Sequence, residues 1–482
     1  MSPDNTVLSH RGEDRKQLRE QLEATLEAIN SSYSDESAFS GIDPNELRRR
    51  IGQIDILPEE GLGFDAALAL LRREVLPHML RTWSVDYMPH LHSPALMESI
   101  PAELVISTYN NSMDSWDQGP AATEVELATV RLLCSLFGYG ADSDGCFTSG
   151  GSQSNLSAIT AARDWWVKKN LDWDVKKHGN PDCYGRLRLY TSSISHFSME
   201  KSCHLLGLGY EAVVKLPVDS QCRIDLAEAR RIIQADVDRG LLPFCIVATI
   251  GTTDFGSVDD IAGLRKLADC FGCHLHADAA YGSGAVMSRR YRDRTGDLSL
   301  ADSITVDFHK MFLLPISCSA ILVRNAGLLS CFELHADYLN REEDEEDGYV
   351  NLVGKSIQTT RRADALKVFF SFLTRGRNGY GRIIDTVISN ADHFYERLCS
   401  DSDFICPVRP TLSSVVFALD RGDDVNRAVR RRLLSEGCVI GQTVYQDRVM
   451  LKFTLLNPAL TPAHIDELIE RIRRAAASVE ES

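Results

Sequence analysis

Two side chains of opposite charge follow apolar, strand-like segments of this sequence. Lys310 lies near the end of "ADSITVDFHKMF", residues 301–312, and Asp278 lies in "HLHADAAYG", residues 274–282. A partly desolvated lysine has a lowered pKa and forms a Schiff base with an aldehyde. A buried carboxylate needs a cationic partner, such as a protonated pyridine nitrogen. The ordinary alternatives are a lysine whose ammonium group reaches water and a carboxylate paired with an arginine or a helix N-terminus.

A glycine-rich turn offers a site for an anion. In "CFTSGGSQSNL", residues 146–156, a short strand leads into Gly150, Gly151 and Ser152, and a helical pattern begins there. The N–H groups of such a turn and the positive end of the helix dipole favour a phosphate. The same turn is also common where it only caps a helix.

Two further polar residues follow strands. His196 lies in "SISHFSMEKS", where an imidazole could stack on a flat cofactor or be structural, and Thr252 follows "FCIVATI". An anion site, an imidazole, a carboxylate and an amine thus occur, in this order, at the ends of strands of one α/β domain. Ligands bind at the carboxyl ends of strands in open α/β sheets. Pyridoxal phosphate fits all four groups.

The elements that must position these residues alternate along the chain. Between about 95 and 375, helical patterns alternate with the apolar segments "RLRLYTSS", "AVVKLP", "FCIVATI", "HLHADAA", "DSITVDF" and "SAILVR". This alternation predicts an α/β domain with a mainly parallel sheet. We expect an N-terminal helical segment at 1–95 that packs in a dimer, a large cofactor-binding domain at 96–375 and a small α+β domain at 376–482.

Composition narrows the class of protein. The chain has 482 residues, a formal net charge of −16 and 13 cysteines. The charge argues against nucleic-acid binding, and the chain has no apolar run of roughly 20 residues that would span a bilayer. The N-terminal residues lack the pattern of a signal peptide, so we expect a cytoplasmic protein with free thiols. "CFGCH" at 270–274 matches a haem-attachment pattern, but a helix ending at Gly272 and a following strand explain it better, and no metal is expected.

Three segments together identify a family resemblance. "TSGGSQSNL", "HADAAYG" and "DSITVDFHK" resemble signature segments of the pyridoxal-phosphate-dependent amino-acid decarboxylases of the glutamate/aromatic-amino-acid group, and the similarity extends from about 60 to 475. The resemblance implies a fold-type I transferase fold with a seven-stranded sheet. It also implies a homodimer with active sites at the interface.

The resemblance assigns roles to individual residues. Lys310 would carry the cofactor, Asp278 would pair with its pyridine nitrogen, and His196 would stack on its ring. The other cofactor contacts would be Gly150, Gly151, Ser152, Thr252, Ala280 and His309, and His309 would contact cofactor or substrate.

Three positions need separate comment. The family's tyrosine on a mobile loop, which protonates Cα after decarboxylation, corresponds to Tyr349. The arginine that binds the substrate carboxylate falls on Lys452, which cannot form a bidentate pair. The asparagine three residues before the cofactor lysine is replaced by Asp307. Because a carboxylate beside a phosphate is electrostatically unfavourable, we do not expect Asp307 to contact the phosphate.

The substrate class is also implied by resemblance. "HADYLNREEDEEDG" and "NLVGKSIQTTRRADALK" are most similar to L-2,4-diaminobutyrate decarboxylases, and lysine and ornithine decarboxylases of siderophore pathways share "SIQTTRR". The acidic segment 340–348 could attract a second substrate amine or be only a solvated loop. We expect decarboxylation of L-2,4-diaminobutyrate to 1,3-diaminopropane. The alternatives are a lysine or ornithine decarboxylase of a siderophore or polyamine pathway, another pyridoxal enzyme such as an aminotransferase or lyase, and a catalytically silent homologue.

Overall fold

The computed structural model describes the chain except residues 1–6, 10–11, 34–35, 337–346 and 481–482. The chain forms two compact units. One contains residues 1–89, 421–451 and 467–482, and the other contains 90–420 and 452–466. The three-part domain division made from the sequence remains a prediction.

The larger unit is built around a seven-stranded sheet, which confirms the predicted α/β class. The strand order is β1-β7-β6-β5-β4-β2-β3. Strand β7 is antiparallel to both of its neighbours, and the remaining pairs are parallel. The bounds are β1 (Asp144–Thr148), β2 (Leu187–Ser192), β3 (Val213–Leu216), β4 (Leu242–Thr249), β5 (His274–Asp278), β6 (Ser303–Asp307) and β7 (Ser319–Val323).

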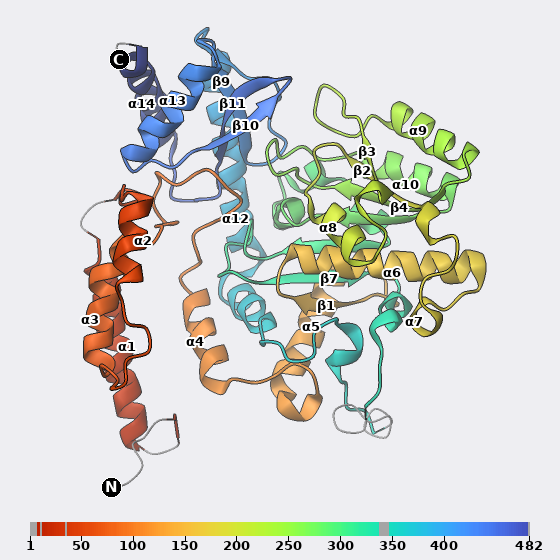
Figure 1. The fold of residues 1–482 in the computed structure, drawn as a ribbon, viewed down its shortest axis with the longest axis horizontal. Coiled ribbons are helices and arrows are strands. Elements are labelled where there is room, and N and C mark those ends of the chain that lie inside the picture. The colour runs from red at the N-terminus through yellow and green to blue at the C-terminus, as the bar shows by residue number, and fades with distance from the viewer. Residues whose placement is uncertain (1–6, 10–11, 34–35, 337–346, 481–482) are drawn as a thin grey trace. The chain divides into compact units, whose positions relative to one another are not determined.

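Helices cover both faces of this sheet. The helices of the larger unit are α4 (Ser99–Tyr109), α5 (Pro120–Leu136), α6 (Gly151–Leu171), α7 (Val175–His178), α8 (Ser198–Leu205), α9 (Leu226–Asp238), α10 (Ile261–Phe271) and α12 (Ala365–Cys399). Helix α6 crosses strands β4 to β7 (Figure 1). Helix α10 ends at its C-cap Gly272 and β5 follows, as expected for the segment around "CFGCH".

The sheet separates two apolar layers because successive strand side chains point to opposite faces. In β2, Leu189 belongs to a buried cluster with Ile159 of α6. The next residue, Tyr190, belongs to a cluster with Leu133 of α5 and Leu264 of α10. The strands are buried on both faces, and this explains why their sequences are nearly continuous apolar runs.

The remaining elements form a smaller sheet and further helices. The smaller sheet has the order β10-β11-β9-β8, and its β8–β9 pair is antiparallel. The bounds are α1 (Gly12–Asn30), α2 (Pro44–Gly52), α3 (Phe64–Glu74), β8 (Phe404–Ile405), β9 (Ser414–Leu419), α13 (Asp423–Ser435), β10 (Gly441–Tyr445), β11 (Arg448–Thr454) and α14 (Pro462–Glu480). Helix α1 lies within the helical segment expected at 1–95.

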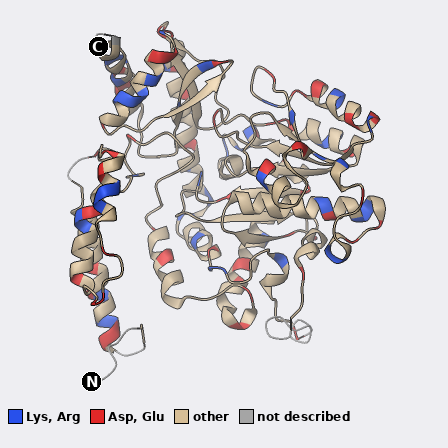
Figure 2. Ribbon diagram, in the orientation of Figure 1, with Lys and Arg blue, Asp and Glu red and all other residues tan. Residues whose placement is uncertain are grey.

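Charged side chains lie mainly on the helices and loops, where both signs are mixed, while the strands of the large sheet carry few of them (Figure 2). Each helix among the described residues is too short or too polar to cross a membrane.

Candidate active site

A cavity of about 360 Å³ lies where β1, β2, β4, β5 and β6 end. This is the edge at which open α/β sheets bind ligands. Its size falls within the range of about 300–1,000 Å³ that is usual for small-molecule sites. The residues that it gathers from those predicted are Gly150, Gly151, Ser152, His196, Asp278, Ala280, His309 and Lys310.

Thr252 and Tyr349 lie outside this lining. Thr252 is buried, and its hydroxyl group bonds the hydroxyl group of Ser257 at 2.7 Å. Tyr349 is 44% exposed, and its ring is tilted by 58° against that of Trp116, with centroids 5.0 Å apart. Most of the acidic segment 340–348 falls outside the described residues. The roles of both side chains remain predictions.

Lys452 also lies outside the lining but contacts a segment that contributes to it. Its Nζ pairs with Asp254 Oδ1 at 2.9 Å and lies 3.4 Å from the carbonyl oxygen of Thr253, which lines the cavity. Lys452 is buried, and its ammonium group is paired with the Asp254 carboxylate beside the cavity. Its proposed contact with a substrate carboxylate would require it to exchange this partner or share it.

The glycine-rich turn opens α6 toward the cavity. The N-cap Gly150 has no side chain to cap the helix, so the N–H groups of Gly151 and Ser152 are left beside the cavity at the positive end of the helix dipole. A Cβ added at Gly151 would lie 2.8 Å from the carboxylate of Asp307. This close approach explains the requirement for glycine there.

Asp307 holds the amine of Lys310. The distance from Lys310 Nζ to Asp307 Oδ2 is 2.8 Å, and His309 Nε2 lies 3.6 Å from the same oxygen. Ser319 also donates its hydroxyl hydrogen to this carboxylate. Burial raises the pKa of Asp307, but the charges of Lys310 and His309 outweigh burial and hold this pKa below its usual value. Asp307 is therefore an ionised group at the base of the cavity.

Asp278 and His196 present a carboxylate and a neutral ring to the same cavity. Asp278 is 5% exposed and accepts hydrogen bonds from Asn155 Nδ2 at 3.0 Å and from the backbone N–H of Ala280 at 3.2 Å. Burial lowers the pKa of His196, and Lys310 lowers it further, against an opposing attraction to Asp278. The imidazole is thus uncharged at neutral pH and suited to stack on a flat ring.

These groups fit pyridoxal phosphate. The open helix N-terminus suits the phosphate, Asp278 suits the pyridine nitrogen, and Lys310 supplies the amine for the aldehyde. Without a side chain at Gly151, the backbone can approach a ligand closely. The cavity therefore combines an anion site, an acceptor-only carboxylate and a nucleophile.

Sequence reasoning missed Asn155, which also lines the cavity. It follows Gly151 by four residues in α6, so both residues lie on the same face of the helix. A usable signal was present, because Ser154, Asn155 and Ser157 are polar residues that lie among apolar ones in the buried first half of this helix.

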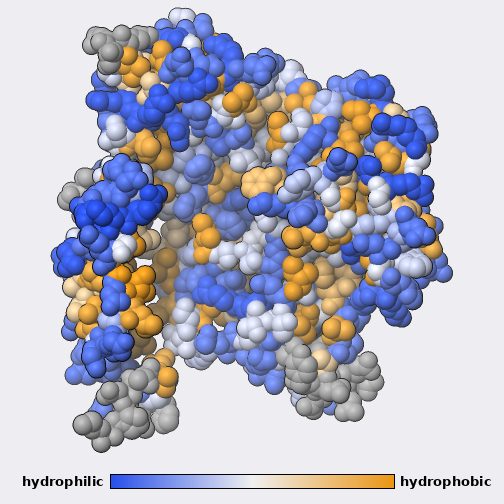
Figure 3. Space-filling view, viewed as in Figure 1, coloured by the Kyte–Doolittle hydropathy of each residue, from blue (hydrophilic) through white to orange (hydrophobic). Residues whose placement is uncertain are grey.

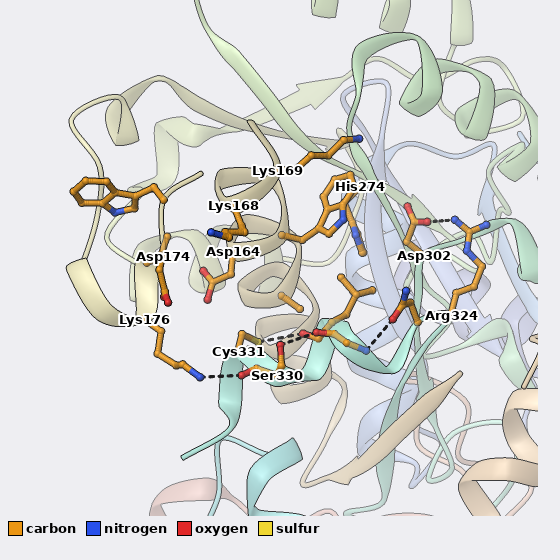
Figure 4. Close-up of a pocket in the computed structure, with 17 residues that line it drawn as sticks. Asp164, Lys168, Lys169, Asp174, Lys176, His274, Asp302, Arg324, Ser330 and Cys331 are labelled. Carbon is orange, nitrogen blue, oxygen red and sulfur yellow. Dashed lines mark hydrogen bonds and ion pairs between the residues drawn. The ribbon is translucent and has the colours of Figure 1, made fainter. Parts of the chain in front are cut away.

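A larger cavity of about 690 Å³ lies beside the C-terminal half of α6 (Figure 4). Its basic side chains are already engaged. Lys176 donates to two backbone carbonyl groups, and Arg324 pairs with Asp302. The strand residue His274 forms part of its wall. Among the residues that line this cavity, no lysine is paired with a carboxylate that also lines it, as Lys310 is paired with Asp307.

His274 and His276 lie on one face of β5 and are fully buried. Burial lowers the pKa of His274 to about 4 and that of His276 to about 3. Each ring has a nitrogen 2.9 Å from the hydroxyl group of Ser303. Both imidazoles are therefore neutral in the folded protein.

We expect the melting temperature to fall as pH decreases from 6.5 to 4. The unfolded chain takes up a proton on each histidine below about pH 6.5, and the folded chain does so only near the lowered pKa values, so stability present above pH 6.5 is lost below it. The loss is about 1.4 kcal/mol per histidine for each pH unit. Thermal melts from pH 7 to 4.5 measure it. His274→Asn should weaken the dependence of melting temperature on pH, and the control His178→Ala, at an exposed histidine, should leave it unchanged. Identical pH profiles for the wild type and both variants would contradict the prediction.

Known proteins resemble this chain over most of its length. A family model described as the pyridoxal-dependent decarboxylase conserved domain matches residues 57–420. The L-2,4-diaminobutyrate decarboxylase of Acinetobacter baumannii is 33% identical over 476 residues, which cover 94% of this chain and 93% of that protein. The enzyme of the same name from Rhizobium meliloti (strain 1021) is 35% identical over 482 residues, covering 98% and 94%.

A solved structure gives the same result for the fold. It is the glutamate decarboxylase domain of the diaminobutyrate-pyruvate transaminase and L-2,4-diaminobutyrate decarboxylase of Vibrio parahaemolyticus. The TM-score is 0.90 and the identity 31%, with 98% of each chain covered.

Proposed function

Because this chain belongs to the pyridoxal-dependent decarboxylase family, we propose that it removes the α-carboxylate of L-2,4-diaminobutyrate and releases 1,3-diaminopropane. The reaction class, a carboxy-lyase that depends on pyridoxal phosphate, follows from the family and from the cavity that joins Lys310, Asp278 and the α6 N-terminus. The substrate is proposed from the relatives' names, because the similarity to them extends over nearly the whole chain.

Each group of the cavity has a task in this reaction. When bound, pyridoxal phosphate supplies a ring that accepts the electron pair left by the departing carboxylate. The N–H groups of Gly151 and Ser152 would bind its phosphate. Asp278 would keep a proton on the pyridine nitrogen, and the neutral imidazole of His196 would cover the ring and exclude water. Lys310 would supply the amine that holds the cofactor.

The remaining assignments complete the proposal. Tyr349 donates a proton to Cα, which directs the reaction to an amine product, and His309 contacts cofactor or substrate. Thr252 and Ala280 lie close to the cofactor. Lys452 attracts the substrate carboxylate electrostatically. Tyr349 would have to approach the cavity from its place on Trp116.

We also propose a cytoplasmic homodimer with active sites at its interface. Helix α1 exposes Leu22, Leu26 and Ile29, and Figure 3 shows hydrophobic side chains gathered over the N-terminal helices. A second copy of the chain would cover this apolar surface. The thirteen cysteines are free thiols, which suits a reducing compartment. The diamine product would serve siderophore or polyamine synthesis.

A product assay tests the proposed function. Purified protein loaded with cofactor is offered L-2,4-diaminobutyrate, ornithine, lysine and glutamate in parallel, and carbon dioxide and amine are measured. We expect 1,3-diaminopropane and carbon dioxide in equal amounts from diaminobutyrate. A kcat/KM for lysine or ornithine above that for diaminobutyrate would make that amino acid the substrate in place of diaminobutyrate. Amine transfer without carbon dioxide release would indicate another pyridoxal chemistry, and inactivity with bound cofactor would indicate a silent homologue.

Asp307→Asn should bind pyridoxal phosphate more tightly, by about three- to tenfold. The substitution removes a negative charge beside Gly151, where the phosphate is proposed to bind, and it removes the ion pair that holds Lys310. Titration of stripped protein, followed by absorbance near about 420 nm, measures the dissociation constant. Asp307→Glu serves as the charge-conserving control. Weaker binding by Asp307→Asn would mean that the carboxylate helps to hold the cofactor.

A further inference from the structure

The two groups proposed to contact the cofactor ring, Asp278 and His196, are connected through one amide. Asn155 is 2% exposed. Its Nδ2 donates to Asp278 Oδ2 at 3.0 Å and to Ser198 Oγ at 2.9 Å. Ser198 Oγ in turn lies 2.9 Å from His196 Nδ1. Both cofactor-facing side chains therefore depend on the orientation of one buried amide group.

That orientation is fixed by the groups on the other side of the amide. Asn155 Oδ1 accepts from Thr305 Oγ1 at 2.7 Å and contacts His276 Nε2 at 3.0 Å. A flipped amide would place its oxygen against the carboxylate of Asp278, which has no hydrogen to donate while ionised. The amide nitrogen must therefore face Asp278, and the oxygen must face His276.

The direction of each following hydrogen bond is then determined. His276 Nε2 carries the proton that Asn155 Oδ1 accepts. Because this imidazole is neutral, its Nδ1 accepts the hydroxyl hydrogen of Ser303. Ser303 Oγ has then used its hydrogen and accepts from His274 Nε2. This chain of hydrogen bonds begins at His274, which lines the larger cavity (Figure 4), and ends at Asn155, which lines the candidate active site.

The same reasoning fixes His196. Ser198 Oγ accepts from Asn155, so its own hydrogen is available for His196 Nδ1. The backbone N–H of Ser198 also donates to that nitrogen, at 3.2 Å. His196 Nδ1 is thus an acceptor, and the proton of the neutral ring lies on Nε2.

We propose that Asn155 is a positioning residue for the cofactor site, one that orients the carboxylate of Asp278 and, through Ser198, supports the tautomer of His196 that the backbone N–H of Ser198 also favours. This inference rests on the proposed roles of Asp278 and His196. Among the residues that the structure describes, Asp278 accepts two bonds on different oxygens, and only the one from Asn155 comes from a side chain. Without that bond the carboxylate can rotate away from the pyridine nitrogen, and the backbone N–H of Ser198 remains as the donor that favours the tautomer of His196.

Asn155→Ala tests the proposal through cofactor affinity. We expect the dissociation constant of pyridoxal phosphate, measured by titration of the stripped protein, to rise about 10- to 100-fold. We expect kcat to fall by a similar factor with KM within about threefold, because Asn155 touches the groups that hold the ring. Asn390→Ala is the matched control, since Asn390 is equally buried and donates to the carbonyl of Leu460 far along the chain.

If Asn155→Ala does not fold, a pair of variants at His276 tests whether the Asn155 amide positions the cofactor site. His276→Gln keeps an N–H donor near the position of Nε2, and His276→Leu removes it. We expect glutamine to retain cofactor affinity within about threefold and leucine to lose at least about tenfold. Equal affinities for Gln and Leu, or an Asn155→Ala protein that binds cofactor as tightly as Asn390→Ala, would overturn the proposal. The affinity measurement needs no substrate, so its result is separate from the identity of the reaction.

Discussion

Lys310→Ala is expected to release carbon dioxide at least about 10³-fold more slowly than the wild-type enzyme and to lack the absorbance band near about 420 nm. The Nζ of Lys310 lies in the cavity at the strand ends, and its side chain is only 20% exposed. Alanine supplies no amine to hold the aldehyde of the cofactor. Carbon dioxide release and the absorbance spectrum after addition of pyridoxal phosphate measure the two effects.

Lys310→Arg separates the lost amine from the lost charge. In Lys310→Ala the buried carboxylate of Asp307 loses its 2.8 Å partner, so part of any effect could come from lowered stability. Arginine stays charged beside Asp307 but does not form a Schiff base. We expect Lys310→Arg to be as inactive as Lys310→Ala and to melt closer to the wild type. Activity of the arginine variant above about 10% of wild type would contradict the proposed role of Lys310.

The alternation of helical and apolar segments was enough to predict the class of the large fold. Local pattern identifies β5 and β6, because "HLHADAA" and "DSITVDF" are buried on both faces and end in polar residues. The strand order could not be predicted in this way. Strand β7 is antiparallel and lies between β1 and β6, and that position depends on pairing between residues far apart in the chain.

Some residues of the candidate site could also be predicted from local sequence pattern, and others could not. Asp278 and Lys310 were predictable because each lies at or just after the end of a strand, and such ends meet at one edge of a parallel sheet. The contact of Asn155 with Asp278 joins residues 123 positions apart and exists only because α6 packs across β5. No local pattern contains that information.

The conformation of a loop also limits which site residues can be predicted from the sequence. Strand β4 ends at Thr249, and the following turn directs Thr252 toward Ser257 while Thr253 lines the cavity. Which of two adjacent threonines faces a ligand is decided by backbone turns and not by strand periodicity. Lys452 likewise meets Asp254 through tertiary packing alone.

Asp278→Asn is expected to lower kcat about 10²- to 10⁴-fold while cofactor still binds. An amide is nearly the same size as a carboxylate but carries no charge to hold a proton on the pyridine nitrogen. Its nitrogen would also face donors, because Asn155 Nδ2 and the N–H of Ala280 both point at this side chain. Steady-state kinetics at saturating cofactor measure the loss, and Asp278→Glu, which keeps the charge, should lose less activity.

The double variant Asn155→Ala with Asp278→Asn distinguishes positioning from general damage to the protein. If Asn155 acts by orienting the carboxylate, removing the amide matters little once the carboxylate is gone. We therefore expect Asn155→Ala to lower kcat by less than about threefold in the Asp278→Asn background, against 10- to 100-fold in the wild type. Residues in one hydrogen-bond network couple in this way, whereas independent residues give additive losses. Fully additive losses would mean that Asn155 supports the site by a route other than Asp278, and the fixed polarity of the Asn155 amide would then act mainly through Ser198 and His196.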